Sequence, residues 1–386
     1  MHITWVTRSF LDYRIPVYKE INRLCGNQLT VIYYTDVVPE RCRLKLEETG
    51  VKAIGLTGEW RITGKKFKPV SSVTKKNFRV PFQPDLIKTI RRTHPDVLLC
   101  DGFFQWSYAA LWLRFFRKIP LVMCYEGTVH TERNSRKLTT LYRKIVSRCM
   151  DAIACNGKQT SDYIASLGYP ESRIFLGNMA ADSAFLQNKV NTVTRENKSE
   201  LKSKLRLNDS VFLFTGRLVS LKGIDKLIEV WSNLFSGNHD VSLLLVGDGE
   251  DKEKLQRLCE EKKLDNVKCT GNIDFDSIYP YLAISDIFII PTLQDNWSLV
   301  VPEAMACGLP VICSKYNGCW PELVKPENGW VFDPLDAENF VQTLQTAWDN
   351  RENWKKMGSE SIQIVADYSP EKVAGSIYKA CQSVLN

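Results

Sequence analysis

Residues 294–314 read QDNWSLVVPEAMACGLPVICS and combine a loop, a short helix and a buried strand in one segment. Pro302 is tolerated in the first turn of a helix, where backbone N–H groups lack intrahelical partners. Ser298, as a small or a capping residue, would let that helix present free backbone amides. Gly308 ends the helix and Pro310 prevents its continuation, after which PVICS has the pattern of a buried strand. The segment therefore predicts a loop, helix and strand in succession.

Two carboxylates stand in this segment. Asp295 lies in the predicted loop and Glu303 in the first turn of the predicted helix, so both are expected to face one edge of a cleft. A carboxylate near a helix N-terminus stabilises that helix by about 0.3–1 kcal/mol, which is one sufficient explanation for Glu303. It leaves Asp295 and the adjacent Trp297 unexplained, so the pair is a candidate binding site.

Strand-like and helix-like segments alternate on both sides of this stretch. The strand-like runs begin with ITWVT, LTVIYY, VKAIGL, DVLLCD, PLVMCY, DAIACN and RIFLGN, and after a polar segment at 186–208 they resume with VFLFTGR, VSLLLVGDG, VKCTG, DIFIIPT, PVICS and WVFD. This cadence predicts two α/β domains of the Rossmann type, each with a doubly wound parallel sheet. We place the domains at 1–185 and 186–368. In such sheets ligands bind beyond the carboxyl ends of the strands.

One such strand end carries basic residues. Gly216, Arg217 and Lys222 follow the strand VFLFT and precede a helix pattern. A helix N-terminus, an Arg fork and a Lys point charge together suit a diphosphate. Two surface cations on a loop are the alternative interpretation of this segment alone.

The bulk composition restricts the class of protein. The chain has 386 residues, no apolar run near the roughly 18 residues of a membrane span, and no basic-then-apolar leader. Its twelve cysteines include no C-x-x-C pair, so we expect reduced core thiols and no metal site. We therefore expect a cytoplasmic protein.

The charge is distributed unevenly. Residues 1–180 carry a net charge of +14 and the remainder −7, and residues 60–84 contain seven Lys or Arg and no acid. The basic loop is either a solvated surface or a contact for an anionic membrane, a phosphorylated acceptor or nucleic acid. Its aromatic residues are too sparse for a nucleic-acid stacking surface, so no nucleic-acid partner is expected.

The spacing Asp295-x7-Glu303 followed by AMACGLPVI, with GRLVSLKG (216–223) and VGDGE (246–250) upstream, resembles the retaining family 4 glycosyltransferases of the GT-B fold. The resemblance implies two Rossmann-like domains facing a cleft, with a last helix at about 369–386 that packs back on the first domain. It implies metal-independent transfer of a sugar from a nucleotide-sugar co-substrate. The resemblance also implies that the acceptor attacks from the leaving-group face, so no protein nucleophile is expected.

The resemblance also implies roles for single residues of the second domain. Asp295, Trp297 and Ser298 replace the usual Glu, Phe and Gly of the family pattern. Glu303 would hold the ribose hydroxyls and Asp295 the transferred sugar. The remaining donor contacts would come from Gly216, Arg217 and Lys222 at the diphosphate, the amides of Ser298 and Leu299 at the sugar, and the backbone near Ile273 at the base.

In the first domain the resemblance assigns Glu126 and His130, directly after the strand PLVMCY, to the catalytic region near the transferred sugar. A surface-loop position is the alternative for His130. Arg8 and Ser9 follow the first strand, where the family often has a glycine-rich loop, and we predict that they contact the acceptor.

A competing pattern is the D-x-D of residues 274–276, which is similar to the manganese site of the other large glycosyltransferase fold. Because it follows the strand VKCTG and opens a helix, we interpret these acids as caps and helix-dipole partners.

The sequence therefore predicts a retaining glycosyltransferase with a nucleotide-diphosphate donor, UDP-sugars preferred, and a glycan or lipid-linked glycan acceptor, as in polysaccharide biosynthesis. A peripheral position on the inner face of an anionic membrane is expected from the basic loop. The alternatives are a nucleotide-sugar epimerase of the same fold and a non-catalytic nucleic-acid-binding protein that uses the basic surface.

Overall fold

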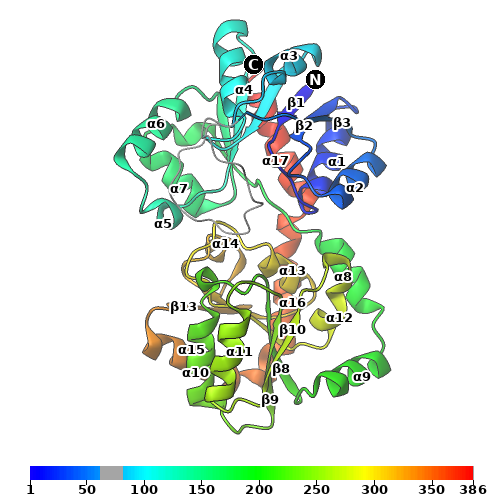
Figure 1. Ribbon diagram of the computed structural model, residues 1–386, viewed down its shortest axis with the longest axis vertical. Coiled ribbons are helices and arrows are strands. Elements are labelled where there is room, and N and C mark those ends of the chain that lie inside the picture. Colours follow the sequence, from blue (N-terminus) through cyan, green and yellow to red (C-terminus); the bar gives the residue numbers. More distant parts are fainter. Residues whose placement is uncertain (61–80, 386) are drawn as a thin grey trace.

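Two parallel α/β domains lie one above the other along the long axis of the protein (Figure 1). The computed structural model describes residues 1–60 and 81–385; the predicted contact of loop 60–84 with an anionic surface falls almost wholly outside them. The sheet of the first domain has seven parallel strands in the order β3-β2-β1-β4-β5-β6-β7. Their bounds are β1 (Ile3–Val6), β2 (Leu29–Tyr34), β3 (Lys52–Leu56), β4 (Val97–Asp101), β5 (Leu121–Tyr125), β6 (Ala152–Cys155) and β7 (Ile174–Leu176).

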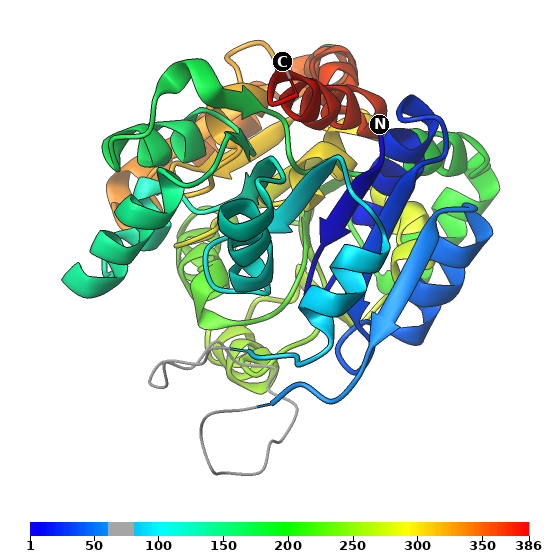
Figure 2. The same cartoon turned by 90° about the horizontal axis from the view of Figure 1, so that it is seen from above.

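Helices cover both faces of this sheet, as the view from above also shows (Figure 2). Consecutive residues of β1 point to opposite faces, because side chains alternate along a strand. Trp5 joins the core cluster that contains Val31, and Val6 joins the cluster on the other face that contains Ile32. The helices are α1 (Arg14–Leu24), α2 (Glu40–Glu48), α3 (Leu86–Arg92), α4 (Ser107–Arg117), α5 (Val129–Glu132), α6 (Lys137–Ser147) and α7 (Lys158–Ser166).

The second domain has a six-stranded parallel sheet in the order β10-β9-β8-β11-β12-β13. All six residues of β9 are buried, as expected for a strand covered on both faces. The strands are β8 (Ser210–Thr215), β9 (Val241–Val246), β10 (Val267–Gly271), β11 (Ile287–Ile290), β12 (Val311–Ser314) and β13 (Gly329–Phe332). The predicted fold class, two doubly wound parallel sheets, is confirmed.

The helices around this sheet are α8 (Ser183–Asn191), α9 (Arg195–Leu205), α10 (Ile224–Phe235), α11 (Lys252–Glu261), α12 (Tyr279–Ala283), α13 (Val300–Ala306), α14 (Trp320–Leu323), α15 (Ala337–Asp349) and α16 (Trp354–Val365). Two of them, α8 and α9, occupy the segment that we expected to be a polar connection. The Thr194 hydroxyl accepts from the amide of Asn197 and so caps α9, while Leu201 and Leu205 pack on the core.

The last helix, α17 (Pro370–Ser383), returns to the first domain, where Figure 1 shows it in red beside α1. Its buried residues Val373, Ala374 and Ile377 belong to the same core cluster as Trp5. The predicted domain boundaries at 185 and 368 stay predictions. Within residues 1–60 and 81–385, every helix is too short or too polar to cross a membrane.

Candidate functional site

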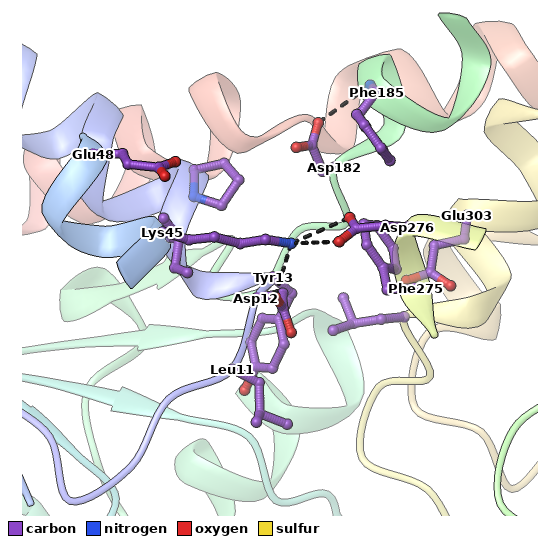
Figure 3. A pocket seen from close by; sticks show the side chains of 13 residues that line it. Leu11, Asp12, Tyr13, Lys45, Glu48, Asp182, Phe185, Phe275, Asp276 and Glu303 are labelled. Atoms are coloured by element: carbon purple, nitrogen blue, oxygen red, sulfur yellow. Dashed lines mark hydrogen bonds and ion pairs between the residues drawn. The ribbon is translucent and has the colours of Figure 1, made fainter. Parts of the chain in front are cut away.

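A cavity of about 410 Å³ lies between the two domains. The segment after β1 and helix α2 line it on one side, and the start of α8, the segment after β10 and helix α13 line it on the other (Figure 3). Its lining residues are Leu11, Asp12, Tyr13, Ile15, Pro16, Lys45, Glu48, Asp182, Phe185, Phe275, Asp276, Leu299 and Glu303.

The Asp295 carboxylate, in the loop after β11, is held by three donors of its own domain. The Lys222 ammonium lies 2.5 Å from Oδ2, the Ser298 hydroxyl donates to the same oxygen at 2.5 Å, and the Trp297 amide donates to Oδ1 at 3.1 Å. The prediction that Ser298 caps the helix is wrong, because its hydroxyl is engaged by Asp295 and the capping residue is Leu299, without a side-chain bond. The structure thus brings Lys222, Ser298 and Asp295 together.

Glu303 lies in the first turn of α13 and points into the cavity (Figure 3). Burial raises the pKa of its carboxyl to about 7. Across the described part of the chain, no hydrogen bond or ion pair reaches this carboxylate. Buried polar groups ordinarily have partners, so a half-buried carboxylate without one is suited to accept hydrogen bonds from a ligand.

Gly216 and Arg217 follow β8, next to the turn after β9. A Cβ on Gly247 would stand 1.8 Å from the carbonyl oxygen of Gly216, so the two turns can approach this closely only with glycine there. Arg217 is exposed, and among residues 1–60 and 81–385 no partner holds its guanidinium.

Of the other predicted donor contacts, Leu299 lines the cavity, whereas Ile273 lies partly buried at the edge of the core. The acids of the D-x-D pattern form ion pairs with the first domain, which we did not predict. Asp276 pairs with Lys45 of the first domain at 3.1 Å, and Asp274 lies 3.8 Å from Arg41. The capping interpretation is wrong for Asp274, because it makes no side-chain cap bond and its carboxylate faces a cation across the cleft.

Glu126 follows β5 on the first-domain wall and forms an ion pair with Arg14 at 3.3 Å. Arg14 is almost fully buried and also donates to the side-chain oxygen of Asn178 at 3.0 Å. Burial raises the pKa of Glu126, Arg14 opposes that shift, and the negative charges of Asp101 and Asp295 add to it. Glu126 is therefore close enough to the second domain to interact with Asp295.

His130 lies on α5 and contacts the opposite domain. Its Nε2 donates to the carbonyl of Leu293 at 3.0 Å, and its ring stacks on Tyr316 with centroids 4.4 Å apart. Burial lowers the pKa of the imidazole, so the neutral ring is favoured near neutral pH.

Arg8 and Ser9, the predicted acceptor contacts, do not line the cavity. Arg8 donates twice to Glu59, from Nε and Nη2, both at 2.8 Å. Glu59 also accepts from the Trp106 indole at 2.9 Å, so the Arg8 charge is already matched within the first domain. Ser9 is exposed, and its carbonyl accepts from Thr7.

Several cavity residues were missed by our reading of the sequence. Asp12 and Tyr13 lie in the segment between the predicted first strand and the following helix, so their position after a strand end was an available signal. Lys45, on α2, carried no such signal, because it reaches the cavity from a helix and pairs with Asp276 more than two hundred positions away.

Solved structures place this architecture in a fold class. Anabaena HepE in complex with UDP superposes with a TM-score of 0.76 at 17% identity, covering 99% of this chain and 100% of that chain. A structure of HepE in complex with UDP-glucose gives a TM-score of 0.73 at 18% identity with the same coverage. The two domains and their cleft therefore have the GT-B fold.

Family models match both halves of the sequence. The model for group 1 glycosyl transferases matches residues 196–363, and the model for glycosyltransferase family 4 matches residues 26–176. The chain belongs to the GT-B glycosyltransferases of group 1 and family 4, a retaining class, as the resemblance implied.

Curated relatives cover the chain in part. An uncharacterized glycosyltransferase of Haemophilus influenzae is 30% identical over 220 residues, 55% of this chain and 59% of its own length. The GDP-mannose-dependent monoacylated alpha-(1-6)-phosphatidylinositol monomannoside mannosyltransferase of Corynebacterium glutamicum is 30% identical over 200 residues, 49% of this chain and 52% of its own length. The chain thus spans little more than half the length of these relatives.

Proposed function

We propose that this protein is a retaining glycosyltransferase that moves a sugar from a nucleotide-diphosphate donor to a glycan or lipid-linked acceptor. One observation carries the proposal: the Lys222–Asp295 pair, 2.5 Å apart, joins the segments that follow β8 and β11, and the segment after β11 leads into the helix that carries Glu303, which has no partner within residues 1–60 and 81–385. A nucleotide sugar offers a diphosphate for cations, and sugar and ribose hydroxyls for carboxylates such as Asp295 and Glu303.

The diphosphate is assigned to Lys222 and Arg217. An ammonium has three N–H donors, and Asp295 accepts one of them, so two stay available for phosphate oxygens. The guanidinium of Arg217 adds a planar pair of donors. Because negative charge grows on the diphosphate as the sugar leaves, fixed cations at that point lower the barrier electrostatically.

The sugar and the ribose are assigned to the two carboxylates. Three donors fix the orientation of Asp295, which favours directional hydrogen bonds to sugar hydroxyls over a role as a mobile acid. Glu303 would accept from the two ribose hydroxyls, which supply the partners that its half-buried carboxylate lacks. UDP is the favoured nucleotide, since HepE, with the same fold, is described in complex with UDP and with UDP-glucose.

The acceptor is assigned to the first-domain wall, where Glu126 and His130 face the second domain. The acceptor hydroxyl would form the new glycosidic bond as the bond to the diphosphate breaks, and its proton would pass to the departing phosphate oxygen. A lipid-linked acceptor is supported by the Corynebacterium relative, whose name specifies a phosphatidylinositol mannoside.

A nucleotide panel tests the proposal. We expect UDP, and to a smaller extent GDP, dTDP or CMP, to raise the melting temperature of the protein in the presence of EDTA. Glu303→Ala should reduce that shift while leaving the unliganded melting temperature within a few degrees. A response to RNA or DNA alone, with none to any nucleotide, would contradict the proposal. Mass analysis of products formed from crude glycolipid then identifies the acceptor.

A further inference from the structure

Helix α6 (Lys137–Ser147) turns its apolar side to solvent. Its outward positions are spaced three or four residues apart and so fall on one face: Leu138 (80% exposed), Leu141 (53%), Tyr142 (38%) and Ile145 (56%). We call these four side chains the α6 stripe. Apolar side chains of an ordinary surface helix point inward, so the arrangement is the reverse of the usual one.

The orientation of α6 is fixed by a charged residue on its inner side. Arg143 is buried. Its Nη1 lies 2.5 Å from the Glu132 carboxylate and 2.9 Å from the Tyr163 hydroxyl. Rotating the helix to bury the stripe would break this ion pair and expose or orphan its partners. The contacts of Arg143 therefore keep the α6 stripe exposed.

Basic residues surround the α6 stripe and no acidic residue does so in the local sequence. Residues 133–150 contain six Lys or Arg and no Asp or Glu. Lys137, Lys144 and Arg148 are all exposed and flank the stripe along the helix. An apolar stripe between cationic side chains suits the boundary of an anionic bilayer, where the stripe enters the acyl region and the cations meet phosphates.

The neighbouring segment has the same character. Residues 102–125 contain no acid, and near the end of α4 Phe115 and Phe116 are among the most exposed apolar side chains. The loop before α4 contacts α6, because Phe104 stacks on Tyr142 with ring centroids 5.0 Å apart. Aromatic and basic side chains thus continue beyond α6.

We propose that α6 is a docking helix that lies in the surface of an anionic phospholipid bilayer. Docking would bring the protein to a lipid-linked acceptor, and in this respect the inference rests on the proposed function. The observation that supports docking is the exposed α6 stripe. Figure 1 shows α6 at the outer side of the first domain. The Glu132–Arg143 pair ties α6 to α5, which carries His130, so a bilayer on α6 lies near the first-domain wall of the cleft.

Charge favours a bilayer over a second copy of the chain. A two-fold dimer through α6 would place the same exposed cations of both copies against one another, which is repulsive. A single stripe on an 11-residue helix is also small beside the roughly 800 Å² per partner of a stable protein interface.

The test is co-sedimentation of the full chain with phosphatidylcholine vesicles that contain or lack phosphatidylglycerol. We expect wild-type binding to the anionic vesicles that weakens with salt. The triple variant Leu138→Ser, Leu141→Ser, Ile145→Ser should lose about tenfold or more in partition coefficient, because it removes most of the inserted apolar surface. Leu335→Ser, at a leucine 61% exposed on the second domain, is the matched control and should bind as wild type.

Equal binding of the triple variant and the wild type, or no wild-type binding to anionic vesicles, would overturn the inference. The inference would also be overturned if light scattering showed a dimer for the wild type and a monomer for the triple variant. A second copy of the chain would then be what covers the α6 stripe. Stabilisation by UDP separates the two proposals. A triple variant that responds to UDP but not to vesicles supports docking, whereas vesicle binding by a wild type that ignores every nucleotide refutes the proposed function alone.

Discussion

The two walls of the cleft hold their polar groups in different ways. On the second-domain wall, Asp295 is fixed by Lys222 and Ser298 of its own domain. On the first-domain wall, His130 and Lys45 are bonded across the cleft, to Leu293 and Asp276. The contacts of Asp295 are therefore made within one domain, whereas the contacts of His130 with Leu293 and of Lys45 with Asp276 depend on how the two domains are placed.

The largest expected effect is on the second-domain wall. Lys222→Ala removes the cation that we assign to the diphosphate and should lower kcat about 10²- to 10³-fold, by analogy with the loss of one transition-state donor. The measurement is release of nucleotide from the donor sugar at saturation. Lys254→Ala, which removes an exposed cation of the same domain from a loose 3.9 Å pair, should leave the rate unchanged. A Lys222→Ala rate within twofold of wild type would remove Lys222 from the site.

On the first-domain wall, the largest effect should be on stability. Arg14→Met leaves the oxygens of Asn178 and Glu126 without their buried donor and should cost about 2–4 kcal/mol in urea unfolding. Arg23→Met, on the same helix but exposed and paired only with Glu20, should change stability little. If the two variants unfold alike, Arg14 does not organise this wall.

Glu303 gives a pH-dependent difference. Because its folded pKa, about 7, lies above the ordinary value of 4.5, the carboxyl destabilises the fold as pH rises through that interval. Glu303→Gln should therefore be more stable than wild type by about 1–3 kcal/mol above pH 7 and nearly equal to it at pH 4. Urea unfolding at the two pH values measures this. A variant less stable at pH 8 would mean that the carboxylate has a stabilising partner.

The smallest effect is expected for the contact across the cleft mouth. Lys45 is 36% exposed and pairs with both Asp12 and Asp276. Solvent screens such a pair, so Lys45→Ala should cost at most about 1 kcal/mol, and less at high salt. Lys158→Ala, which breaks a pair within one helix, is the control. A loss of unfolding free energy well above that limit and independent of salt would contradict the prediction. It would show that Lys45 contributes more to holding the two domains together than a solvent-screened ion pair can.

The strands and the order of their motifs could be predicted because local patterns determine them. Every apolar run quoted from the sequence forms a strand, and the loop and helix around Asp295 and Glu303 lie as predicted. Such features depend on neighbouring residues: a buried strand followed by Gly216, or a helix that ends before Gly308.

The pairing of charged residues could not be predicted in the same way. Arg8 was assigned to the acceptor, yet Glu59, fifty-one positions away, accepts both its hydrogen bonds. The acids of the D-x-D pattern face Arg41 and Lys45 of the other domain. Pairs this distant leave no local pattern, because only the packing of domains brings them together. The roles of Asp295, Glu126 and His130 toward a sugar stay predictions.

The central claim is that Lys222 and Glu303 bind different parts of one nucleotide. Calorimetric titration of UDP and of uridine into wild type, Lys222→Ala and Glu303→Ala tests it directly. We predict that Lys222→Ala weakens UDP at least about tenfold and leaves uridine unchanged, since only the diphosphate meets the ammonium, while Glu303→Ala weakens both ligands. Equal weakening of UDP and uridine by Lys222→Ala, or unchanged binding of both ligands by Glu303→Ala, would contradict the account.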